Sequence, residues 1–223
     1  MAIKSVKVPD PMVPLFEKGE DYVRQYFSSY KADHDKGTIT VGNERYILVR
    51  AKSLRLDFEK HFGAALGLPE DMAREASERF LYILGRSLGQ EDAGHFIQVQ
   101  GVTDPVAKLA AGPIHFNYTG WAFVDIFAES RPSPDKDYFL VYDHPYSFEC
   151  DSYLTAEKAK SERPVCIMNA GYSAGWCSTS FGVDLEAREI MCRARGDKAC
   201  RFVMGVSERL DEYEQWVNDN IKR

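Results

Sequence analysis

The segment CIMNAGYSAGWCSTSFGVDLEAREIMCRARGDKAC, Cys166–Cys200, holds four of the five cysteines of the chain. Its first part predicts a helix from Val165 to Ser178, directly after Pro164. Small residues in this helix permit close backbone packing: Gly171, Ser173, Ala174 and Gly175. The second part, LEAREIMCRA, RGDK and CRFVM, predicts a strand, a turn and a strand. We therefore expect a helix that leads into a hairpin.

The spacing of the cysteines allows a metal site. Cys192 and Cys200 stand at the two ends of the predicted turn, so a hairpin can bring them together. Glu189 would face the opposite side of a regular strand from Cys192, so a bulge or a turn is needed for both to reach one ion. Three thiolates and one carboxylate suit a structural zinc site. The alternative is that the cysteines are small core residues, because free cysteine is commonly buried and no C-x-x-C motif is present.

Upstream of this segment, the sequence predicts helices and a hairpin. TITVGNERYILVR, Thr38–Arg50, reads as two short strands around Gly42-Asn43. An amphipathic helix is predicted before it, from the spacing of Phe16, Tyr22, Tyr26 and Phe27. A second helix is predicted from Glu70 onward. Its apolar face is expected to be formed by Met72, Ala76, Phe80, Ile83 and Leu84.

The middle of the chain predicts a short helix and then strands. In TDPVAKLAAGP we expect Thr103 as the N-cap and Gly112-Pro113 as the end of the helix. IHFNYTGWAFVDIF and DYFLVYD, residues 114–127 and 137–143, are the strongest strand candidates. Two further helices are predicted over residues 152–160 and from Ser207, the latter with Leu210, Tyr213 and Val217 on one face. This order predicts an α+β fold, an antiparallel sheet with packed helices.

Composition excludes several classes of protein. The chain of 223 residues is 44% hydrophobic and 13% aromatic, which suits a globular protein with a core or a core with an apolar pocket. The formal net charge is -6 and no basic stripe is present, so we expect no direct nucleic-acid partner. The sequence contains neither a signal peptide nor an apolar run long enough for a membrane span. We expect a cytoplasmic protein with reduced thiols.

Motifs for nucleotide chemistry are missing. The sequence has no G-x-x-x-x-G-K-[ST] loop, no helix-turn-helix pattern and no glycine-rich dinucleotide fingerprint after a strand. An ATPase or DNA-binding output part is therefore not expected in this chain.

GYSAGWCSTSFG, followed by REIMC and GDKAC, resembles the C-terminal signature of the vinyl-4-reductase domain. The fuller resemblance, over about residues 37–204, is to the N-terminal sensor module of phenol- and toluene-responsive sigma-54 activators. It implies a structural zinc ion held by Cys166, Glu189, Cys192 and Cys200. Cys177 falls outside that set, although it shares a helix face with Cys166.

The resemblance also implies a domain organisation. Residues 1–50 would form an N-terminal dimerisation segment, residues 51–160 the ligand-pocket region, and residues 161–206 the zinc-binding lobe. Residues 207–223 would form a C-terminal linker helix, although the same helix can equally pack on its own domain. The fold of this family also resembles that of vesicle-tethering subunits. The implied activity is sensing: a homodimer binds a small aromatic compound in an apolar pocket close to the zinc.

The pocket positions depart from the pattern of the phenol sensors. Their histidine position falls on Phe116, with His115 one residue early, and on a strand these two side chains would face opposite sides. Their tryptophan position falls on His144, and Ala187 stands where they carry an aromatic residue. The remaining candidate ligand residues are Leu109, Trp121, Tyr142 and Trp176. Phenol itself is therefore only one candidate effector, beside larger or nearly apolar aromatics.

Structural interpretations of these residues stay open. His115 and His144 can be ordinary histidines with satisfied nitrogens, and Trp121 suits the core better than a pocket. His34, His61 and His95 are given no role. The basic group around the hairpin turn is expected to be a solvated surface: Arg193, Arg195, Lys198 and Arg201.

Three functions compete at this point. The first is a sensor that is not an enzyme: it binds a small aromatic effector and relays occupancy to a transcription-activating output domain. The second is a vinyl reductase, which would need an electron donor for which the sequence shows no fingerprint. The third is a scaffold that binds partners or an acyl chain. We favour the sensor.

Overall fold

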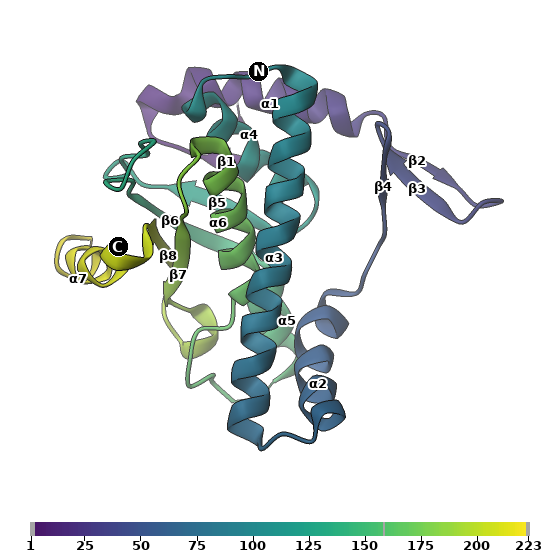
Figure 1. The fold of residues 1–223 in the computed structure, drawn as a ribbon, viewed down its shortest axis with the longest axis vertical. Helices are drawn as coiled ribbons and strands as arrows, with labels where there is room; N and C mark the ends of the chain where they lie inside the picture. Colours follow the sequence, from purple (N-terminus) through teal and green to yellow (C-terminus); the bar gives the residue numbers. More distant parts are fainter. Residues whose placement is uncertain (1–2, 158, 222–223) are drawn as a thin grey trace.

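Two helices, α3 (Glu70–Gln100) and α6 (Ile167–Phe181), pack side by side along the molecule in a computed structural model that describes residues 3–157 and 159–221 (Figure 1). They approach closely through glycines. A Cβ atom at Gly89 would collide with the carbonyl oxygen of Tyr172, and one at Gly171 would collide with that of Tyr82. Gly85 and Gly175 make equivalent contacts. The predicted close packing of the GYSAG helix is thus confirmed.

A five-stranded sheet lies against this helix pair. Its strand order is β1-β5-β6-β8-β7, antiparallel except for the parallel pairing of β1 with β5. The strands are β1 (Val6–Lys7), β5 (Ala122–Ile126), β6 (Leu140–Ser147), β7 (Glu186–Met191) and β8 (Cys200–Gly205). The predicted hairpin of the opening segment is β7–β8, with the short helix η3 (Arg193–Arg195) in its turn. The expected α+β fold is therefore confirmed.

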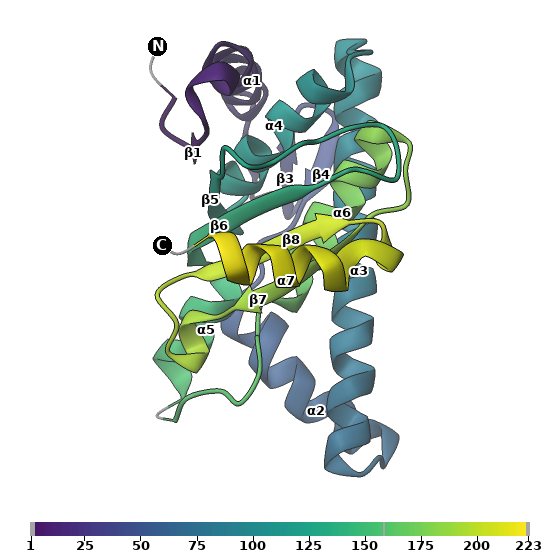
Figure 2. The same ribbon diagram turned by 90° about the vertical axis from the view of Figure 1, so that its left-hand side faces the viewer.

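Helices cover both faces of the sheet. Leu140, Tyr142 and Phe202 point to the face covered by α6 and by α4 (Pro105–Tyr118). Val141 and Val203 alternate with them, as strand geometry requires, and point to the opposite face. There α7 (Leu210–Asn220), which follows η4 (Ser207–Arg209), packs through Leu210, Tyr213 and Val217, the face predicted from sequence (Figure 2). The tail helix thus packs on its own domain.

Helix α4 differs from the sequence prediction. Its N-cap is Asp104, whose carboxylate accepts the Ala107 N–H at 2.7 Å, and not Thr103. The helix also continues through Gly112 and Pro113 to Tyr118, so residues 114–118 are helical and the strand β5 begins only at Ala122. Burial explains this, because α4 is packed between α1, α6 and the sheet and tertiary contacts outweigh local helix propensity.

The buried face of α3 is also not the predicted one. Met72, Phe80 and Ile83 are exposed, while small residues turn inward. The inward face consists of Ala73, Ser77, Leu81, Gly85, Gly89, Ala93 and Phe96. Periodicity weighted by apolarity selects large side chains, whereas contact with α6 selects small ones. Phe80 instead stacks on Phe58 of the neighbouring helix α2 (Phe58–Leu66).

The N-terminal part forms a helix and a projecting arm. After η1 (Asp10–Met12), α1 (Val13–Phe27) crosses one end of the molecule, as predicted. The arm is a three-stranded antiparallel sheet, β2 (Lys31–Asp33), β3 (Thr38–Val41) and β4 (Glu44–Tyr46), that stands away from the body (Figure 1). Its predicted turn at Gly42 is confirmed, and Gly42 adopts a φ of 59°. An exposed linker then leads through a π-helical turn, Ser53–Asp57, to α2.

The remaining helix, α5 (Phe148–Ala156), follows β6 directly and begins four residues before the predicted position. Among the described residues, no helix has both the length and the apolar character that crossing a bilayer requires.

Candidate metal centre and apolar cavity

Four potential metal ligands meet beside the start of α6. One donor atom from each of Cys166, Glu189, Cys192 and Cys200 lies within 4.8 Å of the others, and all four residues are buried. Cys166 is the N-cap of α6, Glu189 belongs to β7, and Cys192 and Cys200 flank the turn that joins β7 to β8. The helix and hairpin of the opening segment therefore converge on one point.

A β-bulge makes this convergence possible. The pairing of β7 with β8 shifts between Glu189, opposite Phe202, and Met191, opposite Arg201. The extra residue turns the strand so that Glu189 and Cys192 face the same side. This is the irregularity that the spacing of these two residues required.

The polar contacts of the cluster leave one oxygen available. The Cys166 N–H donates to Glu189 Oε2 at 2.8 Å, while Oε1 is buried and has no hydrogen-bond partner in the part of the chain that is described. Burial raises the pKa of Glu189 to about 8. A buried, unpartnered carboxylate oxygen among thiols is the arrangement that a bound cation would complete. The residues present thus fit a thiolate-rich metal site.

A buried glutamate fixes the start of α6. Glu149 accepts the N–H groups of Ile167, Met168 and Asn169 at 3.0, 3.0 and 2.8 Å. Its charge is matched by Arg55, whose Nε lies 3.3 Å from Glu149 Oε1 and donates to the Val165 carbonyl. The carboxylate satisfies N–H groups that a helix N-terminus would otherwise leave without partners. Sequence reasoning gave Glu149 no role, because it lies in a different element from the helix that it caps.

An apolar cavity lies between α4, α6 and the sheet. Four of the predicted ligand residues line it: Leu109, Phe116, Tyr142 and Trp176. Its other lining residues include Val124, Ile126, Leu140, Tyr172, Ser173, Cys177 and Met204. The cavity volume is about 30 Å³, room for about two water molecules.

Two hydroxyl groups give the cavity its polar character. Tyr142 is 2% exposed, and its hydroxyl has no hydrogen-bond partner within the described ranges. Burial raises the pKa of Tyr142 well above its ordinary value, and the neighbouring Ser173 hydroxyl offsets this in part. The Trp176 indole N–H is already used, because it donates to the Lys108 carbonyl at 3.0 Å. The Tyr142 hydroxyl is therefore a polar group in this cavity that can receive a ligand.

His115 and Trp121 line a second, larger cavity of about 970 Å³ between the arm, α1 and α3. Because His115 and Phe116 lie on a helix and not on a strand, they differ by about 100° in direction and face different cavities. His115 Nδ1 lies 3.0 Å from the Tyr172 hydroxyl, which donates to Asp92 Oδ2 at 2.7 Å. Burial lowers the pKa of His115.

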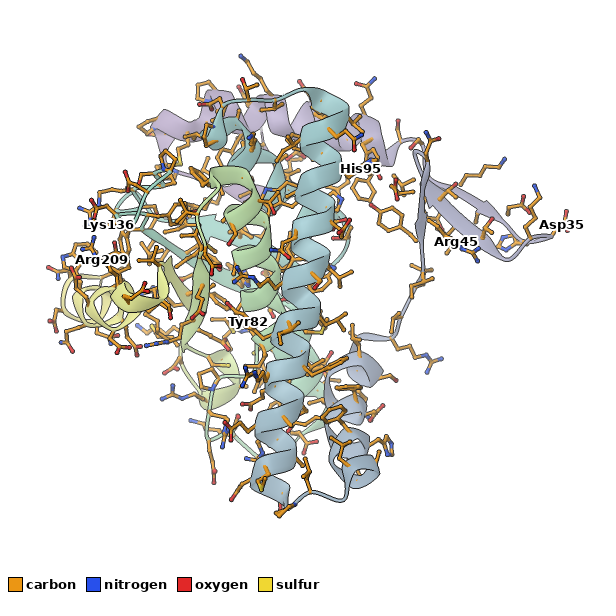
Figure 3. The ribbon with its side chains drawn as sticks, in the orientation of Figure 1. Asp35, Arg45, Tyr82, His95, Lys136 and Arg209 are labelled. Carbon is orange, nitrogen blue, oxygen red and sulfur yellow. The ribbon has the colours of Figure 1, made fainter. Side chains whose placement is uncertain are left out.

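Contacts at the rim of this second cavity connect the arm to α3. His95 of α3 points toward the arm (Figure 3), with Nδ1 3.5 Å from Glu44 Oε1. Tyr46 of β4 places its hydroxyl 3.5 Å from His115 Nε2. Tyr172 therefore borders the apolar cavity with its ring and takes part in the arm-side polar network with its hydroxyl.

His144 lies between the apolar cavity and the cysteine cluster. It is fully buried, its ring packs on Phe116 and Phe202, and it pairs with Cys200 across the sheet. Neither ring nitrogen has a hydrogen-bond partner among the described residues, and burial lowers the pKa of His144 to about 3. His144 is not among the residues that line either cavity.

Sequence reasoning missed Tyr172, Ser173 and Asp92. Tyr172 could have been found, since it precedes Trp176 by four residues and such pairs share one helix face. Asp92 carried no such signal, because its partners come from distant segments. The basic group at the hairpin turn also differs from the expected solvated surface: Arg201 is buried and forms a bidentate pair with Asp143, at 2.8 and 3.1 Å.

Comparisons with known proteins agree with this geometry. Residues 147–206 match the family model of the vinyl-4-reductase domain, and this part of the chain carries all four potential ligands. The phenol regulator MopR of Acinetobacter guillouiae is 24% identical over 200 residues, which are 90% of this chain and 34% of the regulator. The chain thus spans about a third of the length of this curated relative.

Solved structures show a similar fold. The phenol-responsive sensory domain of the transcription activator PoxR, solved with phenol, superposes with a TM-score of 0.73 at 20% identity, covering 96% of this chain and all of that domain. A trafficking protein particle complex subunit 3 from Naegleria fowleri, covalently bound to palmitic acid, gives a TM-score of 0.44 at 12% identity, over 70% of this chain and 93% of the subunit. The resemblance to the sensory modules of phenol-responsive activators is confirmed.

Proposed function

We propose that this chain is a sensory domain that binds a small, phenol-like aromatic compound in the apolar cavity and relays its occupancy to a transcription-activating output domain in the cytoplasm. The observation that carries the proposal is the cavity itself, an apolar space with Phe116, Tyr142 and Trp176 in its wall and a thiol cluster nearby. Its place in a fold shared with a phenol-responsive sensory domain supports the same function.

The Tyr142 hydroxyl defines the class of effector. A buried hydroxyl without a partner costs about 1–3 kcal/mol, and a ligand hydroxyl at this point would remove that cost. The rest of the wall is apolar and suits an aromatic ring. We therefore place phenols ahead of aromatic hydrocarbons as effectors.

Effector binding requires the cavity to widen. The present volume of about 30 Å³ is well below the ~150 Å³ of an apolar cavity that holds benzene. Met204 and Leu109 are flexible enough to move aside. Because the ligand binds only the widened arrangement, it shifts the population toward that arrangement, which is the physical basis of a signal.

Zinc is the metal that best suits the cysteine cluster, and its role there is structural. Cys166, Glu189, Cys192 and Cys200 would hold it. When bound, zinc supplies a rigid cross-link between the start of α6 and the β7–β8 hairpin, so its binding is coupled to folding.

A homodimer is the proposed assembly, with residues 1–50 as the dimerisation segment. The arm stands away from the body, and the linker after it exposes Ile47, Leu48 and Val49 at 76, 81 and 53%. Met72, Phe80, Ile83 and Leu88 form a second uncovered apolar surface on α3. A second copy of this chain would cover both surfaces. In this organisation residues 51–160 supply most of the cavity, residues 161–206 the zinc lobe, and residues 207–223 the connection to the output domain.

Isothermal titration of the zinc-loaded protein tests the effector proposal, with phenol, toluene and cyclohexanol as probes. Phenol is expected to bind without turnover and to raise the melting temperature, with toluene weaker and cyclohexanol weaker still. Tyr142→Phe should weaken phenol binding roughly fivefold to tenfold and leave toluene almost unchanged.

Tyr138→Phe is the matched control for this experiment. Tyr138 is another buried tyrosine whose hydroxyl lacks a partner in the described structure, but it does not line the cavity. Its loss should leave the preference for phenol over toluene intact. The proposal is wrong if folded, zinc-loaded protein binds none of the three compounds.

A further inference from the structure

The fifth cysteine, Cys150, lies in the first turn of α5 and is completely buried. The resemblance to sensor modules assigns it no role. Its thiol nevertheless interacts directly with the thiols of Cys166, Cys192 and Cys200. Cys177, in contrast, lies at the apolar cavity with Tyr138 as its polar neighbour. Cys150 therefore belongs to the metal cluster and Cys177 does not.

The contacts among the four thiols have the connectivity of a tetrahedron. Cys150 contacts each of the other three, Cys166 contacts Cys192 and Cys200, and Cys192 contacts Cys200. The Sγ atoms of Cys166 and Cys200 are 3.8 Å apart. Every pair is thus in mutual contact, as the four corners of a tetrahedral site must be. Structural zinc is bound in this geometry, and four thiolates are one of its common ligand sets.

Several contacts hold Cys150 at this position. Ser147, at the N-cap of α5, places its hydroxyl 3.2 Å from Cys166 Sγ. Arg193, in the turn between Cys192 and Cys200, donates to Asp151 Oδ1 at 2.8 Å and to the Pro145 carbonyl at 3.0 Å. The start of α5 is therefore fixed both to the start of α6 and to the hairpin turn.

Glu189 is already engaged in another contact. Its Oε2 accepts the Cys166 N–H, a bond that orients the helix start. A zinc ion with four thiolates has no remaining position for the carboxylate. Outer residues that hydrogen-bond a ligand's backbone or side chain are a regular part of metal sites.

We propose that the metal centre is a four-thiolate site formed by Cys150, Cys166, Cys192 and Cys200, with Glu189 outside the coordination sphere. This inference rests on the zinc binding proposed above and changes the ligand set implied by the resemblance. The second Glu189 oxygen, Oε1, remains near the thiols and takes the fourth position only when Cys150 is replaced.

Zinc X-ray absorption on the zinc-loaded full chain tests the ligand set, because Zn–S distances of about 2.3 Å separate clearly from Zn–O distances of about 2.0–2.2 Å. The wild type and Glu189→Gln should both show four sulfur ligands. Cys150→Ala should show three sulfurs and one oxygen, and should lose zinc to a chelator roughly tenfold or more faster. Cys177→Ala, which removes a buried thiol elsewhere, should match the wild type.

Each other outcome is informative. Three sulfurs and one oxygen in the wild type, with an altered spectrum in Glu189→Gln, would overturn the four-thiolate site while leaving the proposed zinc centre intact. A wild-type protein that is folded and contains no zinc would overturn the zinc centre itself. If Cys150→Ala fails to fold, the spectra of the wild type and Glu189→Gln still decide the question.

Discussion

At the scale of single residues, His144 shows how a polar side chain can be held in apolar surroundings. Three aromatic rings, those of Phe116, Tyr142 and Phe202, lie 4.4–5.6 Å from its ring, measured between centroids. Its two nitrogens have no hydrogen-bond partners among the described residues, so burial favours the neutral imidazole strongly. This environment has consequences for stability and for pH dependence.

His144→Phe should stabilise the protein by about 1 kcal/mol at pH 7, because it removes two unsatisfied nitrogens from an aromatic cluster. The variant should also lose part of the acid sensitivity. The pKa of His144 is about 3 in the folded state and near 6.5 in the unfolded state, so below pH 6.5 the unfolded chain binds a proton that the folded chain does not. The wild type should therefore lose about 2 kcal/mol between pH 7 and pH 5 from this residue.

Urea denaturation at several pH values measures this effect. The difference between the wild-type and His144→Phe curves isolates His144, since His115 and the thiols contribute to both proteins alike. Parallel curves would mean that His144 is not buried as a neutral side chain.

At the scale of elements, the contact between α3 and α6 is set by four glycines. Gly85 and Gly89 receive the backbone of α6, and Gly171 and Gly175 receive the backbone of α3. Helices at such short distance gain dispersion contacts along their backbones and weak Cα–H···O contacts. The register between the two helices is therefore fixed by the absence of side chains at particular positions.

Gly89→Ala and Gly94→Ala should have opposite effects, although both lie in α3. An added methyl group at Gly89 meets the Tyr172 carbonyl, so we expect a loss of roughly 1–3 kcal/mol as the helices separate. At Gly94 nothing lies within 4 Å of the added carbon, so alanine should stabilise the helix by about 0.5–1 kcal/mol. Thermal unfolding of both variants checks this, and a change of the same sign in both would contradict the interlocked packing.

Local sequence signals predicted elements better than faces and continuations. The β7–β8 hairpin and the tail helix were predicted because turn residues and periodicity are local properties. The passage of α4 through Pro113 and the inward face of α3 depend on neighbours distant in sequence. The same holds for the site: the spacing indicated Cys192 and Cys200, whereas Cys150 comes from a different helix and gave no signal.

At the scale of the whole molecule, the chain combines a closed body with an open arm. The body buries its sheet on both faces, and the arm touches the body mainly through tyrosine and histidine contacts at one end. The apolar linker after the arm lies uncovered. Such an uncovered apolar surface favours association with another chain.

Leu48→Glu should shift the protein from dimer to monomer, because it places a charge in the apolar linker that a second copy is proposed to cover. Leu154→Glu is the matched control, since Leu154 is an exposed leucine on α5, away from the arm. Size-exclusion chromatography with light scattering distinguishes the two states. A monomeric wild type, or equal behaviour of the two variants, would contradict an interface at the linker.

The glycine contacts also make α3 a mechanical lever. Its 31 residues span about 46 Å, and Gly85 lies at the midpoint, where α6 grips it. If α6 shifts when an effector enters beside Tyr172 and Trp176, the grip does not let α3 slide, so the shift becomes a tilt. A tilt of about 5° about that fulcrum would carry each end of α3 some ~2 Å in opposite directions. One end lies beside α2 and the other beside the arm, so a small movement at the centre would be amplified at both extremities of the molecule.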